Sequence, residues 1–157
     1  MKHFISLLLM SIALATTAIG QHQSAKTREN EIIDLEKSFA AAIKTQDTLQ
    51  TKRFQTDNYF LAYAVLGMPI QIVPRQNWLI LLKDYVTESF TIDDIKVNVY
   101  GKTAIAMLLC TQKATVRGQD RSGQFVLTDI WHQGKKGWHI AERHSSRPGP
   151  PLTLQSK

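Results

Sequence analysis

A glycine-bounded turn, Gly134-Lys135-Lys136-Gly137, constrains the fold of this chain more than any other feature of its sequence. It joins two segments, residues 125–133 and 138–146, that contain neither glycine nor proline. Two such segments around a short glycine-containing loop are typical of an antiparallel β-hairpin. We therefore expect a hairpin over Phe125–Ser146.

The turn allows two registers, which place different side chains opposite each other. A four-residue loop would put Asp129 opposite Glu142. A three-residue loop, with a type I turn followed by a residue in the left-handed conformation, pairs Asp129 with Arg143 instead. We expect this second register, because Gly137 stands where the resulting bulge needs a glycine.

Side chains alternate along a strand, so the preferred register also assigns each residue to a face. Asp129 then lies in an otherwise apolar row. One face carries Leu127, Asp129 and Trp131 beside Ala141, Arg143 and Ser145; the other carries Thr128, Ile130 and His132 beside Ile140, Glu142 and His144.

The first part of the chain is predicted to be mainly helical. Apolar residues at helical spacing predict an amphipathic helix over Glu29–Thr45. Asp47 can cap a short second helix that brings Leu49 and Phe54 inward. A strand over Asn58–Ala64 and a helix opened by Pro74 are expected to follow, the latter with Trp78, Leu81, Leu82 and Tyr85 on one side.

Strands follow the helices. Alternation over residues 95–100 predicts a half-buried strand, and Thr103–Arg117 predicts a long one. Helices followed by antiparallel strands indicate an α+β fold in which a curved, mostly antiparallel sheet wraps around the N-terminal helices. Residues 103–110 are apolar on both faces, so we expect a second subunit to cover the outer face in a homodimer.

The N-terminus has the pattern of a secretory signal. Lys2 precedes an apolar run of 12 residues, Phe4–Ala15, and small residues follow before Gln21. A membrane-spanning helix needs about 20 apolar residues, so we expect no span once the signal is removed. The prediction is a signal peptide over 1–20, a linker over 21–28, one domain over 29–148 and a flexible tail over 149–157, exported to the periplasm or the medium.

Composition excludes several functional classes. The net charge of +6 is spread over basic residues that stand singly or in pairs, with none of the basic and aromatic clustering of nucleic-acid-binding proteins. Cys110 is the only cysteine, in an apolar stretch that predicts an inert buried thiol. His132 and His144 are predicted to lie about 13 Å apart on one face, while His139 points the other way, so no metal site is expected. No phosphate loop or nucleophile motif is present, and no cofactor is predicted.

The hairpin resembles a known family. The stretch Thr128-Asp129-Ile130-Trp131, the glycine turn and Gly137–Pro148 resemble the closing strands of the nuclear transport factor 2-like (NTF2-like) superfamily, particularly its SnoaL-like and calcium/calmodulin-dependent kinase association-domain branches. The order of elements agrees over nearly all of Glu29–Pro148, and the matching residues lie in the hairpin. The resemblance implies a cone-shaped α+β roll that encloses a pocket, usually in a dimer. Members include isomerases, cyclases, dehydratases and proteins without known activity, so the resemblance does not fix a function.

The resemblance also implies that Asp129 points into that pocket. Beside Arg143 we expect Asp129 to stay ionised, which suits orienting a polar ligand better than accepting protons. Tyr59 and Tyr63 share a face of the first strand and are candidate phenolic donors; strand packing is the alternative for both, and a structural ion pair is the alternative for Asp129 with Arg143. The predicted ligand-binding set is Tyr59, Tyr63, Leu127, Asp129, Trp131, Arg143 and Ser145.

Two functions follow from this reasoning. The first is an exported NTF2-like domain that binds an unknown small molecule in the cone pocket and dimerises. The alternative is a SnoaL-like isomerase, cyclase or lyase with Asp129 as catalytic acid or base.

Overall fold

The structure, a computed structural model, describes residues 26–149. The predicted signal peptide over 1–20 and nearly all of the predicted tail over 149–157 lie outside this range. Residues 26–28, predicted to be linker, already belong to the first helix, which runs through residues 26–44. No helix in residues 26–149 is both long and apolar enough to span a membrane.

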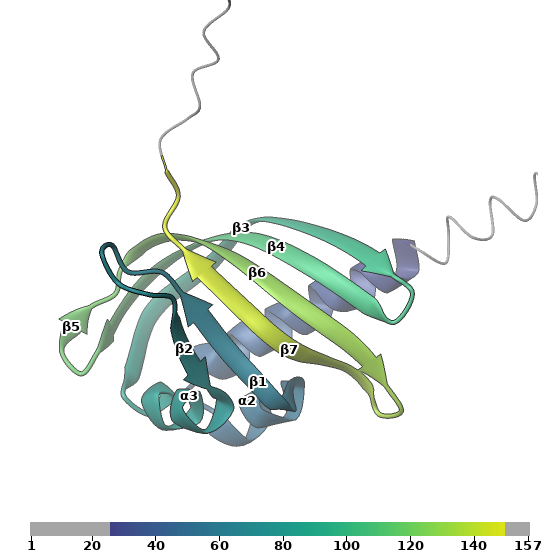
Figure 1. The fold of residues 1–157 in the computed structure, drawn as a ribbon, viewed down its shortest axis with the longest axis horizontal. Helices are drawn as coiled ribbons and strands as arrows, with labels where there is room; N and C mark the ends of the chain where they lie inside the picture. The colour runs from purple at the N-terminus through teal and green to yellow at the C-terminus, as the bar shows by residue number, and fades with distance from the viewer. Residues whose placement is uncertain (1–25, 150–157) are drawn as a thin grey trace, which may run out of the picture.

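Two short helices and the strands follow the N-terminal helix, and Figure 1 labels them along the chain. They are α2 (Thr48–Phe54), β1 (Gln55–Tyr63), β2 (Gln71–Pro74), α3 (Arg75–Leu82), β3 (Tyr85–Tyr100), β4 (Thr103–Val116), β5 (Gln119–Asp120), β6 (Gly123–Gly134) and β7 (Gly137–Ser146). As predicted, Asp47 caps α2, its side chain accepting a hydrogen bond from the Gln50 N–H at 2.8 Å.

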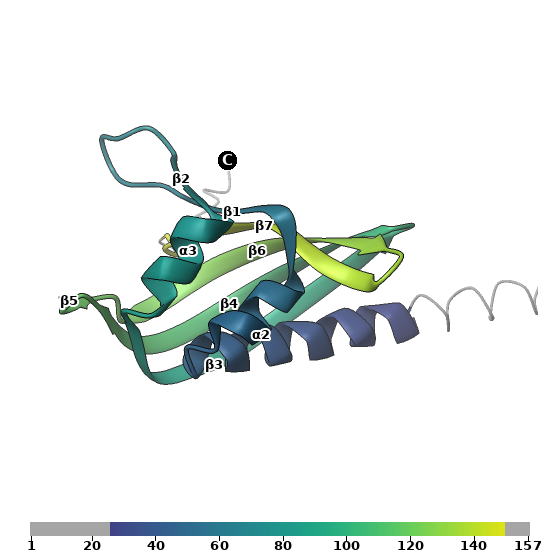
Figure 2. The ribbon, with the colours of Figure 1, turned by 90° about the horizontal axis from the view of Figure 1, so that it is seen from below.

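The strands form one curved sheet in the order β2-β1-β7-β6-β4-β3, with β5 paired to β4. Only the pairing of β1 with β7 is parallel in the described sheet; the others are antiparallel. The N-terminal helix lies along the concave face, and α2 and α3 close one end (Figures 1 and 2). The predicted α+β class, with a curved sheet around N-terminal helices, is confirmed.

The core lies between that helix and the concave face. Ile32, Phe39 and Ile43 of the helix are buried, and Phe39 packs edge-on against Trp131 at a centroid distance of 6.4 Å. Leu49 was predicted to point inward, but it is 75% exposed. The inward prediction for Leu49 was wrong because the residues of α2 that point into the fold are Thr51, which is buried, and Phe54, which packs against the core.

The pairing of Asp129 with Arg143 is confirmed, but the turn that produces it was predicted wrongly. Gly134 pairs directly with Gly137, which leaves a two-residue loop instead of three. A bulge at Ala141 then shifts the register by one residue, between the Trp131–Ile140 and Ile130–Glu142 pairs. Gly137 does have positive φ, at 99°.

The bulge also changes the faces that His139 and Ile140 take. His139 was predicted to point away from His132, but the two residues are directly paired and so share a face. Ile140 was assigned to the outer face, but it pairs with Trp131 and is fully buried in the core. The extra residue at Ala141 lets both Ile140 and Arg143 point inward although they are three positions apart.

Some strands differ from their predicted extents. β3 begins at Tyr85, ten residues before the predicted strand, and two irregularities in its pairing with β4 interrupt the simple alternation of side chains. β2 was not predicted, because Gly67 and Pro69 indicate only a turn. The long strand β4 agrees with its prediction to within one residue.

Candidate functional site

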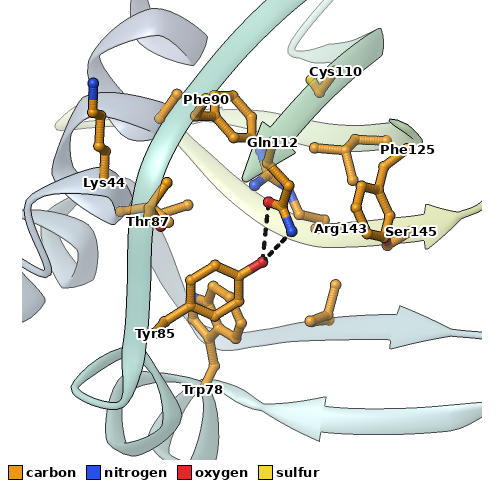
Figure 3. Close-up of a pocket in the computed structure, with 14 residues that line it drawn as sticks. Lys44, Trp78, Tyr85, Thr87, Phe90, Cys110, Gln112, Phe125, Arg143 and Ser145 are labelled. Carbon is orange, nitrogen blue, oxygen red and sulfur yellow. Dashed lines mark hydrogen bonds between the residues drawn. The ribbon is translucent and has the colours of Figure 1, made fainter. Parts of the chain in front are cut away.

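The concave face of the sheet and the N-terminal helix enclose an inner cavity of about 110 Å³. Its walls are mainly apolar and include Ile43 of the helix, Trp78 of α3, Phe90 of β3 and Phe125 and Leu127 of β6. Figure 3 shows polar groups among the lining residues, which include Arg143 and Ser145 of β7, Thr87 of β3, and a hydrogen-bonded pair formed by Tyr85 and Gln112.

A wider outer cavity of about 490 Å³ adjoins the inner one. Five residues line both: Leu61, Trp78, Tyr85, Phe125 and Ser145. The outer cavity continues to a rim formed by the end of β1, the β4–β5 turn and the end of β7. The two cavities therefore form one path from the rim to the Arg143 side chain.

Arg143 is held in place by two carboxylates behind the cavity wall. Its Nε donates to Asp129 Oδ1 at 2.8 Å, and its Nη2 donates to Asp129 Oδ2 and, at 3.5 Å, to Glu36 Oε2. The guanidinium also lies over the Phe39 ring, 4.8 Å from its centroid. Trp131 Nε1 donates to Glu36 Oε1 at 2.6 Å, which fixes the second carboxylate.

The buried cluster contains two carboxyl groups, Glu36 and Asp129, and one guanidinium, Arg143. If all three were charged, the cluster would carry one excess negative charge. Burial, and then the charge of Asp129, raise the pKa of Glu36 well above its ordinary value, and Arg143 offsets only part of this. Burial alone would lower the pKa of Arg143, but the Asp129 carboxylate outweighs it and raises that pKa. With Glu36 protonated, one guanidinium faces one carboxylate.

Tyr59 lies in this buried layer and not in the cavity wall. It is 1% exposed, and its hydroxyl has no hydrogen-bond partner within residues 26–149. The hydroxyl of Thr51 and both amide atoms of Gln55 are also buried without partners there. Burial raises the pKa of Tyr59, so its phenol stays neutral.

The structure distributes the predicted site residues over three places. Leu127, Arg143 and Ser145 line the inner cavity, and Tyr63 lines the outer cavity with Ser145. Asp129, Trp131 and Tyr59 lie behind the wall, fully buried, where the first two contact Arg143 and Glu36. Whether any of them binds a ligand stays a prediction.

Sequence reasoning missed Glu36, Tyr85 and Gln112 as site residues. Glu36 is one helical turn after Ile32 and so belongs to the apolar face of the helix, and a carboxylate at a core position was the signal to follow. Gln112 donates to the Arg121 carbonyl at 2.6 Å, and its amide lies within hydrogen-bonding distance of the Tyr85 hydroxyl. Only the β3–β4 pairing brings these two side chains together.

Neither Cys110 nor a metal centre adds chemistry here. Cys110 is buried, and burial raises the pKa of its thiol to about 12, so the reactive thiolate is absent at neutral pH. Within residues 26–149, no group of three or more His, Cys, Asp or Glu side chains is arranged to hold a metal ion.

Comparison with known proteins agrees with this geometry. Residues 82–150 match the model of the SnoaL-like domain. An NTF2-like protein from Cytophaga hutchinsonii superposes with a TM-score of 0.68 at 13% identity, over 74% of this chain and 95% of that one. The chain has the NTF2-like fold. The resemblance seen in the hairpin sequence is thereby confirmed.

Two further solved structures superpose on this chain. An NTF2-like protein of unknown function in nutrient uptake from Rhodospirillum rubrum gives a TM-score of 0.66 at 18% identity, covering 73% of this chain and 96% of that one. The association domain of C. elegans CaMKII gives 0.62 at 14% identity, covering 79% and 98%. No curated protein matches the chain.

Proposed function

We propose that this NTF2-like domain binds a small, mainly apolar molecule whose polar head group is recognised by Arg143 in the inner cavity. The observation that carries the proposal is that one nitrogen of this guanidinium has no hydrogen-bond partner among the described residues. Nε and Nη2 are engaged by carboxylates, whereas Nη1 makes no hydrogen bond within residues 26–149 and the side chain lines the cavity. A carboxylate or another strong acceptor is the natural partner of such a donor.

Two other donors in the cavity wall support a polar head group. Trp78 Nε1 and the Thr87 hydroxyl are buried and have no partner within the described residues. Buried donors are normally satisfied by protein, water or ligand. The apolar side chains of the wall would then enclose the rest of the molecule.

The geometry favours binding over the alternative, an isomerase, cyclase or lyase that uses Asp129 as acid or base. A catalytic carboxylate must reach the proton it transfers. Asp129 is 0% exposed, does not line the cavity, and directs both oxygens at Arg143. A large loss of turnover in Asp129→Asn, on a carbonyl substrate and at unchanged thermal stability, would support the enzyme instead.

The binding proposal is tested by calorimetry with hexanoate and 1-hexanol, two probes of equal chain length. We expect hexanoate to bind more tightly, by about tenfold or more, because only its carboxylate can pair with Arg143. Ser145→Phe narrows the junction of the two cavities and should abolish binding. The matched control is His144→Phe, on the exposed opposite face, which should bind normally. Equal affinity for both probes, or for both variants, would refute the proposal.

We also propose that the chain forms a homodimer through the outer face of β4. Ile105 and Leu109 are half-buried there and Met107 is 43% exposed. The C. elegans neighbour is an association domain, which favours this idea. Light scattering after size exclusion should give twice the chain mass, and Met107→Glu should give a monomer. A monomeric wild-type protein would exclude the dimer.

Export completes the proposal. The basic start, apolar run and small residues over 1–20 are the support for it. The mass of the protein recovered from expressing cells should correspond to a chain that begins near Gln21. An intact N-terminus on a cytoplasmic product would contradict export.

A further inference from the structure

An apolar segment is exposed at the rim of the outer cavity. Residues 60–74 contain no charged side chain, and they form the hairpin of β1 and β2. At its tip, defined here as residues 65–70, Leu66 is 103% exposed, Ile70 71% and Met68 57%. Such a cluster on a surface marks a contact with an apolar partner.

The tip is a hydrogen-bonded turn that leaves the side chains of Leu66, Met68 and Ile70 exposed. The Met68 N–H donates to the Val65 carbonyl at 3.0 Å, and Gly67 adopts the positive φ of 77° that this turn requires. The hairpin extends beyond the sheet, away from the N-terminal helix (Figure 2). Nothing within residues 26–149 covers these side chains.

Basic residues stand on the other side of the same opening. Val65 lines the outer cavity together with Arg117 of the β4–β5 turn, Arg121 directly after β5 and Arg147 directly after β7. Arg117 pairs with Asp84 at 2.8 Å, and Arg121 donates to the Gln119 amide oxygen at 3.2 Å. Arg147 lies over the Phe125 ring and donates to the Ser122 carbonyl at 3.0 Å. Asp84 pairs with Arg117 and Asp120 is exposed on β5, so the three arginines exceed the two neighbouring carboxylates by one positive charge. The opening therefore has an apolar lip and a weakly cationic lip.

We infer that this opening docks on an anionic lipid bilayer, with the tip inserted among the lipids and the arginines against the head groups. The inference rests on the proposed function, since an apolar acid that fits the inner cavity partitions into membranes. Apolar side chains enter the interfacial region, and basic residues gain from the negative surface potential. Docked in this way, the cavity would open onto the membrane surface.

A protein partner fits these features less well. β2 is an edge strand that could pair with another chain, but it has four residues and ends at Pro74, which cannot donate to a ladder. The exposed apolar residues stand on a narrow turn and not on a broad face, whereas a stable protein interface needs about 800 Å² per partner.

The test places a fluorophore at the tip of the protein produced from the full chain. Leu66→Cys carries an environment-sensitive nitrobenzoxadiazole label, and the buried Cys110 does not react. Leu49→Cys is the matched control, because Leu49 is also an exposed leucine but lies on α2. The vesicles contain phosphatidylcholine alone or mixed equally with phosphatidylglycerol.

We expect the Leu66 label to shift to the blue and brighten with the anionic vesicles, with about tenfold weaker binding to phosphatidylcholine. Arg117→Gln with Arg121→Gln should weaken the anionic binding by a similar factor, and added salt should do the same. The Leu49 label should not respond. Because it reports one site, this signal is independent of any binding by the N-terminal segment.

Three outcomes would overturn the inference. They are no response at Leu66, an equal response at Leu49, and a Leu66 response that depends on protein concentration without vesicles, which would indicate contact between copies of the chain. Ser145→Phe separates this inference from the proposed function: it should lose hexanoate but keep the vesicle response. A protein that fails to bind hexanoate would therefore refute the proposed function only, and the vesicle response would still decide the docking inference.

Discussion

The two ends of the path through this molecule reverse the usual distribution of polar and apolar groups. Its inner end rests on a guanidinium and two carboxylates that are almost completely buried, while its outer end exposes leucine, methionine and isoleucine. Buried charges are tolerated only when paired, and exposed apolar clusters usually have a partner. The difference teaches that the buried charges at the inner end depend on partners inside the chain. The exposed side chains of the tip have no such partners within residues 26–149 and do not stabilise the fold.

The largest effect is expected from Arg143→Met, which leaves the Asp129 carboxylate buried without its cation. Breaking one side of a buried ion pair costs about 3–5 kcal/mol, so the free energy of unfolding should fall by that amount in urea denaturation. The exposed Arg121→Met should change it by less than about 0.5 kcal/mol. The double variant Asp129→Leu with Arg143→Met should recover most of the loss. A single variant as stable as the wild type would show that the cluster is not needed for folding.

A pH-dependent effect of intermediate size is expected at Glu36. Its pKa is raised in the folded state, by burial and then by Asp129, so the folded chain holds a proton that the unfolded chain releases near pH 4.3. The stability from this proton is complete below that pH and is lost as the pH rises toward the folded-state pKa, by at most about 1.4 kcal/mol per pH unit.

Glu36→Gln removes this titration while keeping an acceptor for Trp131 Nε1. Stability curves of the wild type and the Gln variant, measured by thermal unfolding across pH, should therefore separate as the pH rises above about 4.3, with the variant relatively more stable at higher pH. Parallel curves would show that Glu36 is ionised in the folded protein and that the cluster carries an excess negative charge.

The smallest effect is expected at the tip. Leu66→Ser should change the free energy of unfolding by less than about 0.5 kcal/mol, because a fully exposed side chain has no packing to lose. Leu82→Ser, at a position that is 0% exposed, should cost several times more, about 2–5 kcal/mol. A marked loss for Leu66→Ser in urea denaturation would mean that the tip is covered in solution.

How much of this site the sequence predicts depends on how far apart its residues are along the chain. Asp129 and Arg143 lie on neighbouring strands joined by a short turn, and their pairing was correctly predicted. The route to it was wrong, because a two-residue loop and a bulge at Ala141 give the same pairing as the three-residue loop that was expected. The alternation of side chains along the two strands cannot distinguish one loop length from another when a bulge restores the same pairing.

Glu36 shows where local reasoning ends. Its position on the helix is readable from the spacing of Ile32 and Phe39, but its contacts with Arg143 and Trp131 join residues about a hundred positions apart. A carboxylate on an apolar helix face is usually a cost, and only the arrival of those two strands makes it a satisfied group. The tip was read as a simple turn for a related reason, because exposure is a property of the folded surface.

The sequence by itself determined the α+β class, the helix cap at Asp47, the long strand over residues 103–116 and the resemblance to the NTF2-like superfamily, since these follow from periodicity, turn residues and neighbouring contacts. Only the tertiary structure decided that Arg143 stands between Asp129 and Glu36 at the end of a cavity, and that the β1–β2 tip is left uncovered at its rim. Burial and long-range contact create those properties, because a side chain acquires its charge state and its exposure from neighbours that the folded chain brings to it.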